Sequence, residues 1–168
     1  IDFYNAFYSK AEKSKAHAIF CEKVYGINLC QHGMADAAQI DTLVEETGIG
    51  ESSTVLDVGC GTGSITNYIR EKTKCRITGM DISPAAIEMA IQSHAAKSGR
   101  IDFVVGDIES HTLEAKAYDS ILLIDTHYFI DDFPALIPRL LSALKDNGKL
   151  AVFSDEGRGI DGADDSGV

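Results

Sequence analysis

The sequence predicts an α/β protein with a doubly wound, mostly parallel sheet. Short apolar segments typical of buried strands, such as residues 120–124, alternate with longer segments of helical periodicity. A turn with glycines at alternate positions, residues 59–63, follows the apolar segment 54–58 and leads into a helical segment. Acidic residues follow several of the predicted strands, where parallel sheets bind their ligands. These observations favour a sheet with a ligand site at its carboxyl edge.

The composition is that of one globular domain spanning residues 1–168. The chain is 45% hydrophobic and 24% charged, which is ordinary for a folded domain of this length. Fifteen basic residues against 26 acidic ones give a net charge of −11, so nucleic acid is not an expected partner. The sequence shows no membrane span, signal peptide or zinc-type cysteine spacing, so we expect a cytoplasmic protein with reduced thiols and no metal.

Residues 1–47 form a predicted helical segment that precedes the sheet. Phe3, Phe7 and Ala11 recur at helical spacing. A second helix is expected over residues 35–46, where Gly48 ends it.

The core, residues 54–154, alternates strands with helices. The predicted strands cover residues 54–58, 76–80, 101–105, 120–124 and 149–154, and the helices 64–72, 84–98 and 132–145. Ser83 and Pro84 form an N-cap and first-turn pair for the second of these helices. Pro134 and Pro138 favour a bend in the third helix. Asn147 and Gly148 predict a turn into the fifth strand.

The glycine turn carries a specific acidic residue. The spacing is Asp-x-Gly-x-Gly-x-Gly from Asp57 to Gly63. Glycines are needed where a Cβ would clash with a ligand or forbid positive φ. A dinucleotide site would place phosphates at this turn, where a nearby carboxylate repels them. Asp57 at the mouth of the turn instead suits a cationic ligand that bears an ammonium and a sulfonium, such as S-adenosylmethionine.

Residues 55–63, Val-Leu-Asp-Val-Gly-Cys-Gly-Thr-Gly, resemble the first motif of the class I S-adenosylmethionine-dependent methyltransferases. The resemblance extends over about residues 20–154 by the order of elements. It implies a Rossmann-like methyltransferase fold, S-adenosylmethionine as cofactor and S-adenosylhomocysteine as product. The cofactor-binding residues that this motif implies are Asp57, Gly59, Cys60, Gly61, Thr62 and Gly63.

Two further strand ends match the family. Asp81 corresponds to the acidic residue that binds the ribose hydroxyls, and Ile82 to an apolar face for adenine. Gly106, Asp107 and Ile108 correspond to the family's contact with the adenine amino group. Two structural alternatives stay open: Asp81 as a helix-initiating residue beside Ser83, and Asp107 as a turn residue.

The end of the fourth strand lies where the family places the transferring methyl group. Asp125 is predicted there as a cofactor-binding or catalytic residue, and His127 as a general base, since its unperturbed pKa lies near neutrality. A surface or packing role is the alternative for His127. Upstream, Tyr25, His32 and Gly33 resemble the segment that small-molecule methyltransferases fold over the methionine end of the cofactor. His32 is a second candidate base, and a simple connecting loop is the alternative.

The sequence therefore predicts methyl transfer from S-adenosylmethionine to a small-molecule acceptor by in-line displacement. It contains neither an Asn-Pro-Pro-Tyr motif nor a Pro-Cys pair, which nucleic-acid methyltransferases use. The rival functions are a nicotinamide- or flavin-binding oxidoreductase and a noncatalytic binding module. The oligomeric state is not indicated.

The family's sixth and seventh strands have no predicted counterpart. Only a tail rich in glycine and aspartate, residues 155–168, follows the fifth strand. Because residue 1 is Ile rather than Met, we expect that the sequence is a trimmed one.

Overall fold

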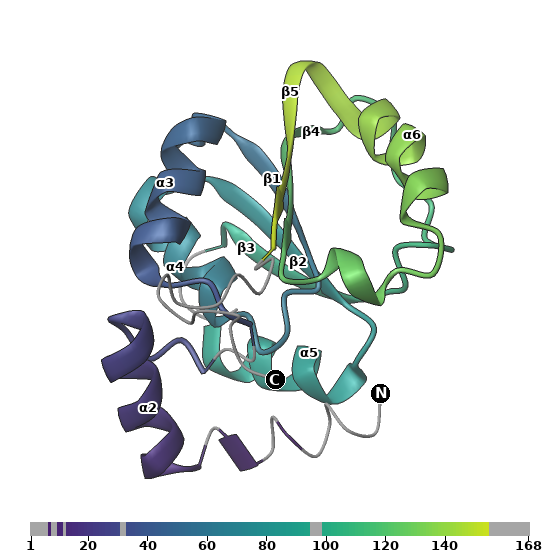
Figure 1. The fold of residues 1–168 in the computed structure, drawn as a ribbon. Helices are drawn as coiled ribbons and strands as arrows, with labels where there is room; N and C mark the ends of the chain where they lie inside the picture. Colours follow the sequence, from purple (N-terminus) through teal and green to yellow (C-terminus); the bar gives the residue numbers. More distant parts are fainter. Residues whose placement is uncertain (1–6, 8–9, 12, 31–32, 95–98, 155–168) are drawn as a thin grey trace, which may run out of the picture.

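A computed structural model describes residues 7, 10–11, 13–30, 33–94 and 99–154 (Figure 1). Its five strands form one sheet in the order β3-β2-β1-β4-β5, with every neighbouring pair parallel. They are β1 Thr54–Val58, β2 Arg76–Asp81, β3 Ile101–Val105, β4 Tyr118–Ile124 and β5 Leu144–Phe153. The predicted doubly wound fold is confirmed. The described residues contain no strand beyond β5.

Helices cover both faces of the sheet. They are α2 Lys15–Tyr25, α3 Ala37–Thr47, α4 Ser64–Thr73, α5 Pro84–His94 and α6 Phe133–Ala143, with a short 3-10 helix, η2 His127–Phe129. α3 and α4 lie on one side of the sheet, and α6 lies on the other (Figure 1). α5 contacts β2, β3 and α4.

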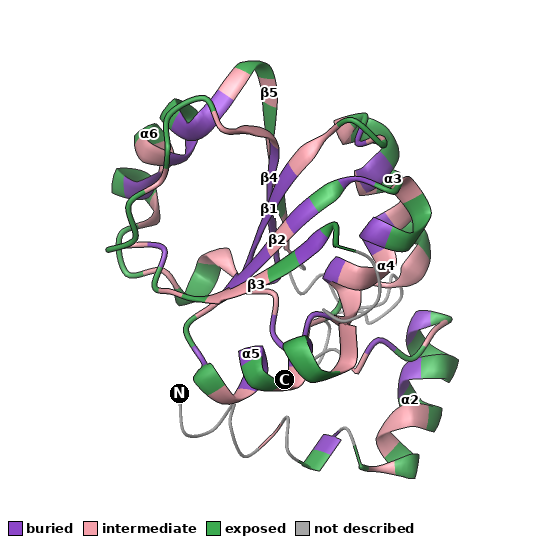
Figure 2. Cartoon of the chain, turned by 180° about the vertical axis from the view of Figure 1, so that it is seen from behind, coloured by how far each residue is buried: buried purple, intermediate pink, exposed green. Residues whose placement is uncertain are grey.

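The strands divide their side chains between two cores because successive residues point to opposite faces. Val55 and Leu122 pack with residues of α3 and α4. Leu56 and Leu123 pack with Leu140 and its neighbours on α6. β1 and β4 are therefore buried along most of their length (Figure 2).

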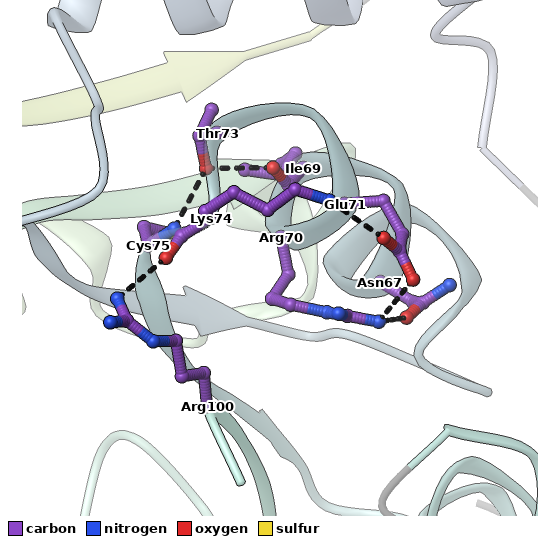
Figure 3. Close-up of polar contacts among 8 residues, drawn as sticks. All are labelled: Asn67, Ile69, Arg70, Glu71, Thr73, Lys74, Cys75 and Arg100. Atoms are coloured by element: carbon purple, nitrogen blue, oxygen red, sulfur yellow. Dashed lines mark hydrogen bonds and ion pairs between the residues drawn. The ribbon is translucent and has the colours of Figure 1, made fainter. Parts of the chain in front are cut away.

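The helix ends follow the local signals of the sequence. Asp36 and Gln39 form a capping box at the start of α3, and Gly48, in the left-handed conformation, ends it. At the end of α4 the Thr73 hydroxyl donates to the Ile69 carbonyl and accepts from the Cys75 amide (Figure 3). These bonds turn the chain directly from α4 into β2.

Two boundaries differ from prediction. α6 ends at Ala143 rather than at residue 145, and it runs through Pro138 as one helix. The predicted Asn147 turn lies inside β5, where the register moves from Tyr118 opposite Leu144 to Ser120 opposite Lys149. Asn147 has a φ of 67°, so the turn residues form an irregularity in the strand rather than a separate loop.

Candidate active site

A cavity of about 440 Å³ opens at the carboxyl ends of β1, β2, β3 and β4. Its size is within the range of small-molecule sites. It lies where the strand order reverses, between β1 and β4, which is the expected position of a ligand in this sheet topology. The predicted site residues in its lining are Gly33, Gly59, Cys60, Gly61, Thr62, Asp81, Ile82, Gly106, Asp107, Ile108 and Asp125.

The glycine turn is held against β2 and packed by protein side chains. The amides of Gly59 and Cys60 both donate to the Met80 carbonyl, at 2.7 and 3.1 Å. Gly59 and Gly63 have φ values of 77° and 76°, so the predicted need for positive φ is met. A Cβ on Gly63 would lie 2.5 Å from the Phe103 ring, and one on Gly59 would overlap Thr126. At these two positions, protein side chains rather than a ligand therefore occupy the space that a Cβ would need.

Asp57 does not lie at the mouth of the turn, as the sequence analysis expected. Its side chain is only 2% exposed and is absent from the cavity lining. It points to the α4 side of the sheet, where the Thr66 hydroxyl donates to its Oδ2 at 2.6 Å. Burial and, to a smaller extent, the charge of Asp81 raise the pKa of Asp57 to about 6, against the lowering effect of the Thr66 hydrogen bond.

Asp81 joins the glycine turn to the start of α5. Its Oδ2 accepts from the Gly61 amide at 2.9 Å, and its Oδ1 accepts from the Ser83 amide at 2.8 Å. The Ser83 hydroxyl in turn accepts from the Ala86 amide. Asp81 thus supports the first turn of α5, which was its structural alternative, while its side chain also borders the cavity.

Residues 106–108 form the next part of the wall. The Gly106 amide donates to the Asp81 carbonyl at 3.0 Å, so this loop is fixed to the end of β2. Asp107 Oδ1 accepts from the Glu109 amide, which makes Asp107 a turn residue as well as a lining residue. Ile108 is buried, whereas Ile82 is 50% exposed and offers an apolar surface to a ligand.

Asp125 fastens the segment before α3 to the end of β4. Its Oδ2 accepts from the amides of Met34 and Ala35, at 2.5 and 3.1 Å. A Cβ on Gly33 would lie 2.5 Å from the same oxygen. Asp125 itself has a φ of 50° and is 7% exposed. The structure therefore brings Gly33 and Asp125 together, from segments about 90 residues apart, with the carboxylate engaged by backbone amides.

Besides Asp57, the predicted residues Gly63, Tyr25 and His127 lie outside this lining. Tyr25 is buried, and its hydroxyl donates to Met34 Sδ at 3.7 Å; burial raises its pKa, with smaller contributions from Cys21 and Asp125. His127 opens η2, and its ring packs against Tyr128 and Phe133. Its Nδ1 has no hydrogen-bond partner among the described residues. His32 lies outside the described residues.

The sequence analysis missed part of the lining. Leu29 and Cys30 precede the segment that Asp125 fastens, and Glu109, Phe129 and Asp131 follow β3 and β4 at some distance from the strand ends. Their only signal was proximity in the sequence to a predicted strand end, which does not say how a loop folds back over the sheet.

The part of the chain that the structure describes has neither a metal-binding cluster nor a membrane-spanning helix. No group of three or more His, Cys, Asp or Glu side chains there is placed to hold a metal ion. None of the helices described is both long and apolar enough to cross a bilayer.

Comparison with known proteins adds a family to this geometry. A family model described as a methyltransferase domain matches residues 55–148. The chain is 30% identical over 131 residues to phosphoethanolamine N-methyltransferase 1 of Arabidopsis thaliana, covering 78% of this chain and 26% of that protein. It is 38% identical over 98 residues to malonyl-[acyl-carrier protein] O-methyltransferase 1 of Ilyobacter polytropus, covering 58% and 36%. The chain thus spans about a quarter to a third of these relatives.

Solved structures share the fold. Phosphoethanolamine N-methyltransferase 2 of Haemonchus contortus, in complex with phosphomonomethylethanolamine and S-adenosylhomocysteine, aligns with a TM-score of 0.70 at 21% identity, over 89% of this chain and 35% of that one. The [4+2]-cyclase SpnF aligns with a TM-score of 0.65 at 26% identity, over 73% of this chain and 46% of that one. The same fold therefore accompanies more than one kind of chemistry.

Proposed function

The chain belongs to the class I S-adenosylmethionine-dependent methyltransferase family, and we propose that the protein transfers a methyl group from S-adenosylmethionine to a small-molecule acceptor. The observation that carries this proposal is the cavity at the reversal of strand order, bordered by a glycine turn to which Asp81 is hydrogen-bonded. A small-molecule acceptor is also consistent with the relatives, whose names specify phosphoethanolamine and malonyl-[acyl-carrier protein].

The residues of the cavity fit such a cofactor. The main chain of residues 59–62 borders the cavity with little side-chain bulk, which suits the close approach of a ligand. We assign Asp81 to the ribose hydroxyls, and Ile82 with residues 106–108 to the adenine. When bound, the cofactor supplies a methyl group on a sulfonium, which is already an activated leaving group.

The task of the protein is then mainly to position the acceptor and to exclude water. Asp125 contributes by fastening residues 33–35 beside the cavity. We do not include His127 as a base in this proposal, because its ring packs on Tyr128 and Phe133 and does not line the cavity. His32 and Tyr25 remain predictions from the resemblance.

The rival functions are less well supported. A nicotinamide or flavin cofactor would bring a diphosphate to a turn whose Gly61 amide is hydrogen-bonded to the Asp81 carboxylate, which lines the same cavity. The net charge of −11 likewise disfavours nucleic acid. Four cysteines without disulfide-type spacing favour a reducing compartment such as the cytoplasm.

Calorimetric titration with S-adenosylhomocysteine tests cofactor binding. We expect binding by the wild-type protein, and a loss of roughly 1–3 kcal/mol in Asp81→Ala because charge-assisted hydrogen bonds are removed. Asp102→Asn, an exposed change on β3 outside the lining, is the matched control. Unchanged affinity in Asp81→Ala would remove Asp81 from the site, and absent binding by the wild type would refute the proposal.

An enzyme can be distinguished from a noncatalytic binding module by whether the protein transfers the methyl group. Incubation with methyl-labelled S-adenosylmethionine and a metabolite extract should give a labelled small molecule together with S-adenosylhomocysteine. Binding of the cofactor without any labelled product would favour the noncatalytic module.

A further inference from the structure

The cavity has an unbalanced charge. Five carboxylate side chains line it: Asp81, Asp107, Glu109, Asp125 and Asp131. Among the described residues, no Lys, Arg or His side chain does so. The neighbouring cation, Arg139, donates to the backbone carbonyls of Glu109 and His111 rather than to a lining carboxylate. An anionic group that entered this cavity would therefore meet repulsion without a cationic partner.

The cofactor does not account for all of these carboxylates. Under the proposed function Asp81 and Asp107 face the adenosine, and Asp125 is engaged by the amides of Met34 and Ala35. Glu109 and Asp131 have no part in that assignment. S-adenosylmethionine carries two positive charges and one carboxylate, so its single net charge leaves the lining strongly negative.

The Glu109 carboxylate is held beside the main chain of residues 131 and 132. Glu109 follows β3 and Asp131 follows η2, and the Asp131 amide donates to Glu109 Oε2 at 3.2 Å. The Asp132 amide donates to the other carboxylate oxygen, also at 3.2 Å. The Asp131 side chain is exposed and makes no hydrogen bond among the described residues. The two carboxylates thus form one anionic corner of the cavity.

An aromatic side chain lies in the same part of the chain. Phe129 lines the cavity and is 55% exposed, and its ring centroid is 4.6 Å from that of Tyr128. Carboxylates beside an aromatic face are suited to an ammonium group, which gains both charge attraction and cation–π contact. Among the described lining residues, no cationic side chain is available to a phosphate.

We propose that the methyl acceptor is an amine without a phosphate or carboxylate group, which binds as its ammonium ion at Glu109, Asp131 and Phe129. The ammonium loses a proton to water before its nitrogen attacks the methyl carbon, the S–CH₃ bond breaks, and S-adenosylhomocysteine is the leaving group. This inference rests on the proposed function, since it concerns the acceptor side of the same cavity. It separates the protein from its relatives named as phosphoethanolamine methyltransferases, whose substrate carries a phosphate.

The test is binding to the protein saturated with S-adenosylhomocysteine, measured by calorimetry with amines matched in shape and different in charge. The pairs are ethanolamine with phosphoethanolamine, and tyramine with tyrosine. We expect the purely cationic member of at least one pair to bind about tenfold or more tightly than its partner, and to weaken as salt is added. Equal or tighter binding of the members that carry a phosphate or carboxylate, or no binding of either cation, would overturn the inference.

Substitutions of the two carboxylates test whether the cation binds at this part of the cavity. Glu109→Gln, which keeps a carbonyl oxygen for one of the two backbone amides, and Asp131→Asn should each weaken binding of the cation severalfold while leaving S-adenosylhomocysteine affinity unchanged. Asp102→Asn removes an equivalent charge outside the cavity and should change neither. Cation binding that is insensitive to both cavity variants would also contradict the inference. Failure of S-adenosylhomocysteine to bind the wild-type protein would instead refute the proposed function, so the two failures are distinguishable.

Discussion

Asp57 and Asp125 are both buried carboxylates, but they accept hydrogen bonds from different kinds of donor. Asp57 has one hydroxyl donor, Thr66. Asp125 has two backbone amide donors on a single oxygen. Buried charges without full compensation weaken folding, so we expect Asp57 to make stability depend on pH.

For Asp57 the direction of this dependence follows from its raised pKa. The folded value is about 6 and the usual value is 3.8, so between these values the folded protein binds more protons than the unfolded chain. The contribution of Asp57 to stability is therefore greatest below about pH 4 and falls as the pH rises through about 6.

We predict that Asp57→Asn removes this fall while keeping an acceptor for Thr66. The free energy of unfolding of the wild type relative to Asp57→Asn should drop by on the order of 2–3 kcal/mol between pH 4 and pH 7. Denaturant unfolding at several pH values measures this difference. Parallel stability profiles for the two proteins would contradict the burial argument.

Asp125 is predicted to act as a positioning residue. Asp125→Ala should weaken S-adenosylhomocysteine binding by roughly 1–3 kcal/mol, because the amides of Met34 and Ala35 lose their acceptor and residues 33–35 lose their anchor. Asp125→Asn keeps a carbonyl oxygen and should recover much of the affinity. If the two variants are equally impaired, the negative charge itself, rather than the anchoring of this segment, is what the site requires.

At the scale of elements, the glycine turn links β1, α4 and the loops after β2 and β4. Its amides bond to Met80, and its Cβ positions are closed by Phe103 and Thr126. The turn is therefore part of the packing of the molecule as well as a wall of the cavity.

We predict that Gly63→Ala lowers the free energy of unfolding by about 2–4 kcal/mol, because it combines an unfavourable positive φ with a clash against Phe103. Gly50→Ala is a matched control, since a Cβ at that position would meet nothing within 4 Å and the φ of Gly50 is not positive. That control should change stability by less than about 1 kcal/mol. Urea unfolding of both variants checks the contrast, and equal stabilities would show that the turn relaxes.

At the scale of the whole molecule, the cavity joins parts that are distant in sequence. Residues before α3, the glycine turn, and the loops after β2, β3 and β4 all contribute to its lining. A ligand that contacts all of them stabilises the folded state as a unit, because it cannot bind the unfolded chain.

Saturating S-adenosylhomocysteine should therefore raise the melting temperature. At a hundredfold excess over its dissociation constant the gain is about 2.7 kcal/mol, which corresponds to roughly 5–10 °C for a chain of this length. Thermal unfolding with and without the ligand measures the shift, and NAD serves as the comparison ligand. A shift with NAD of the same size would contradict the specificity of the site for an adenosyl donor.

The fold and much of the cavity lining could be predicted because their signals are local. The apolar strands, the end of α3 at Gly48 and the positive-φ glycines each depend on a few consecutive residues. Asp81 and residues 106–108 were identifiable since parallel strands present their carboxyl ends at one edge. The identity of the family followed from nine consecutive residues, 55–63.

The sequence by itself thus determined the order of strands and helices, the glycine turn and the family. Only the tertiary structure decided that Asp57 is buried behind the turn, that Asp125 fastens residues 33–35, and that the Asp131 amide is hydrogen-bonded to Glu109 in a cavity also lined by Phe129. The physical reason is distance along the chain. Backbone conformation is set by neighbours in sequence, whereas side-chain burial and the partners of a carboxylate depend on segments that meet only when the sheet has formed.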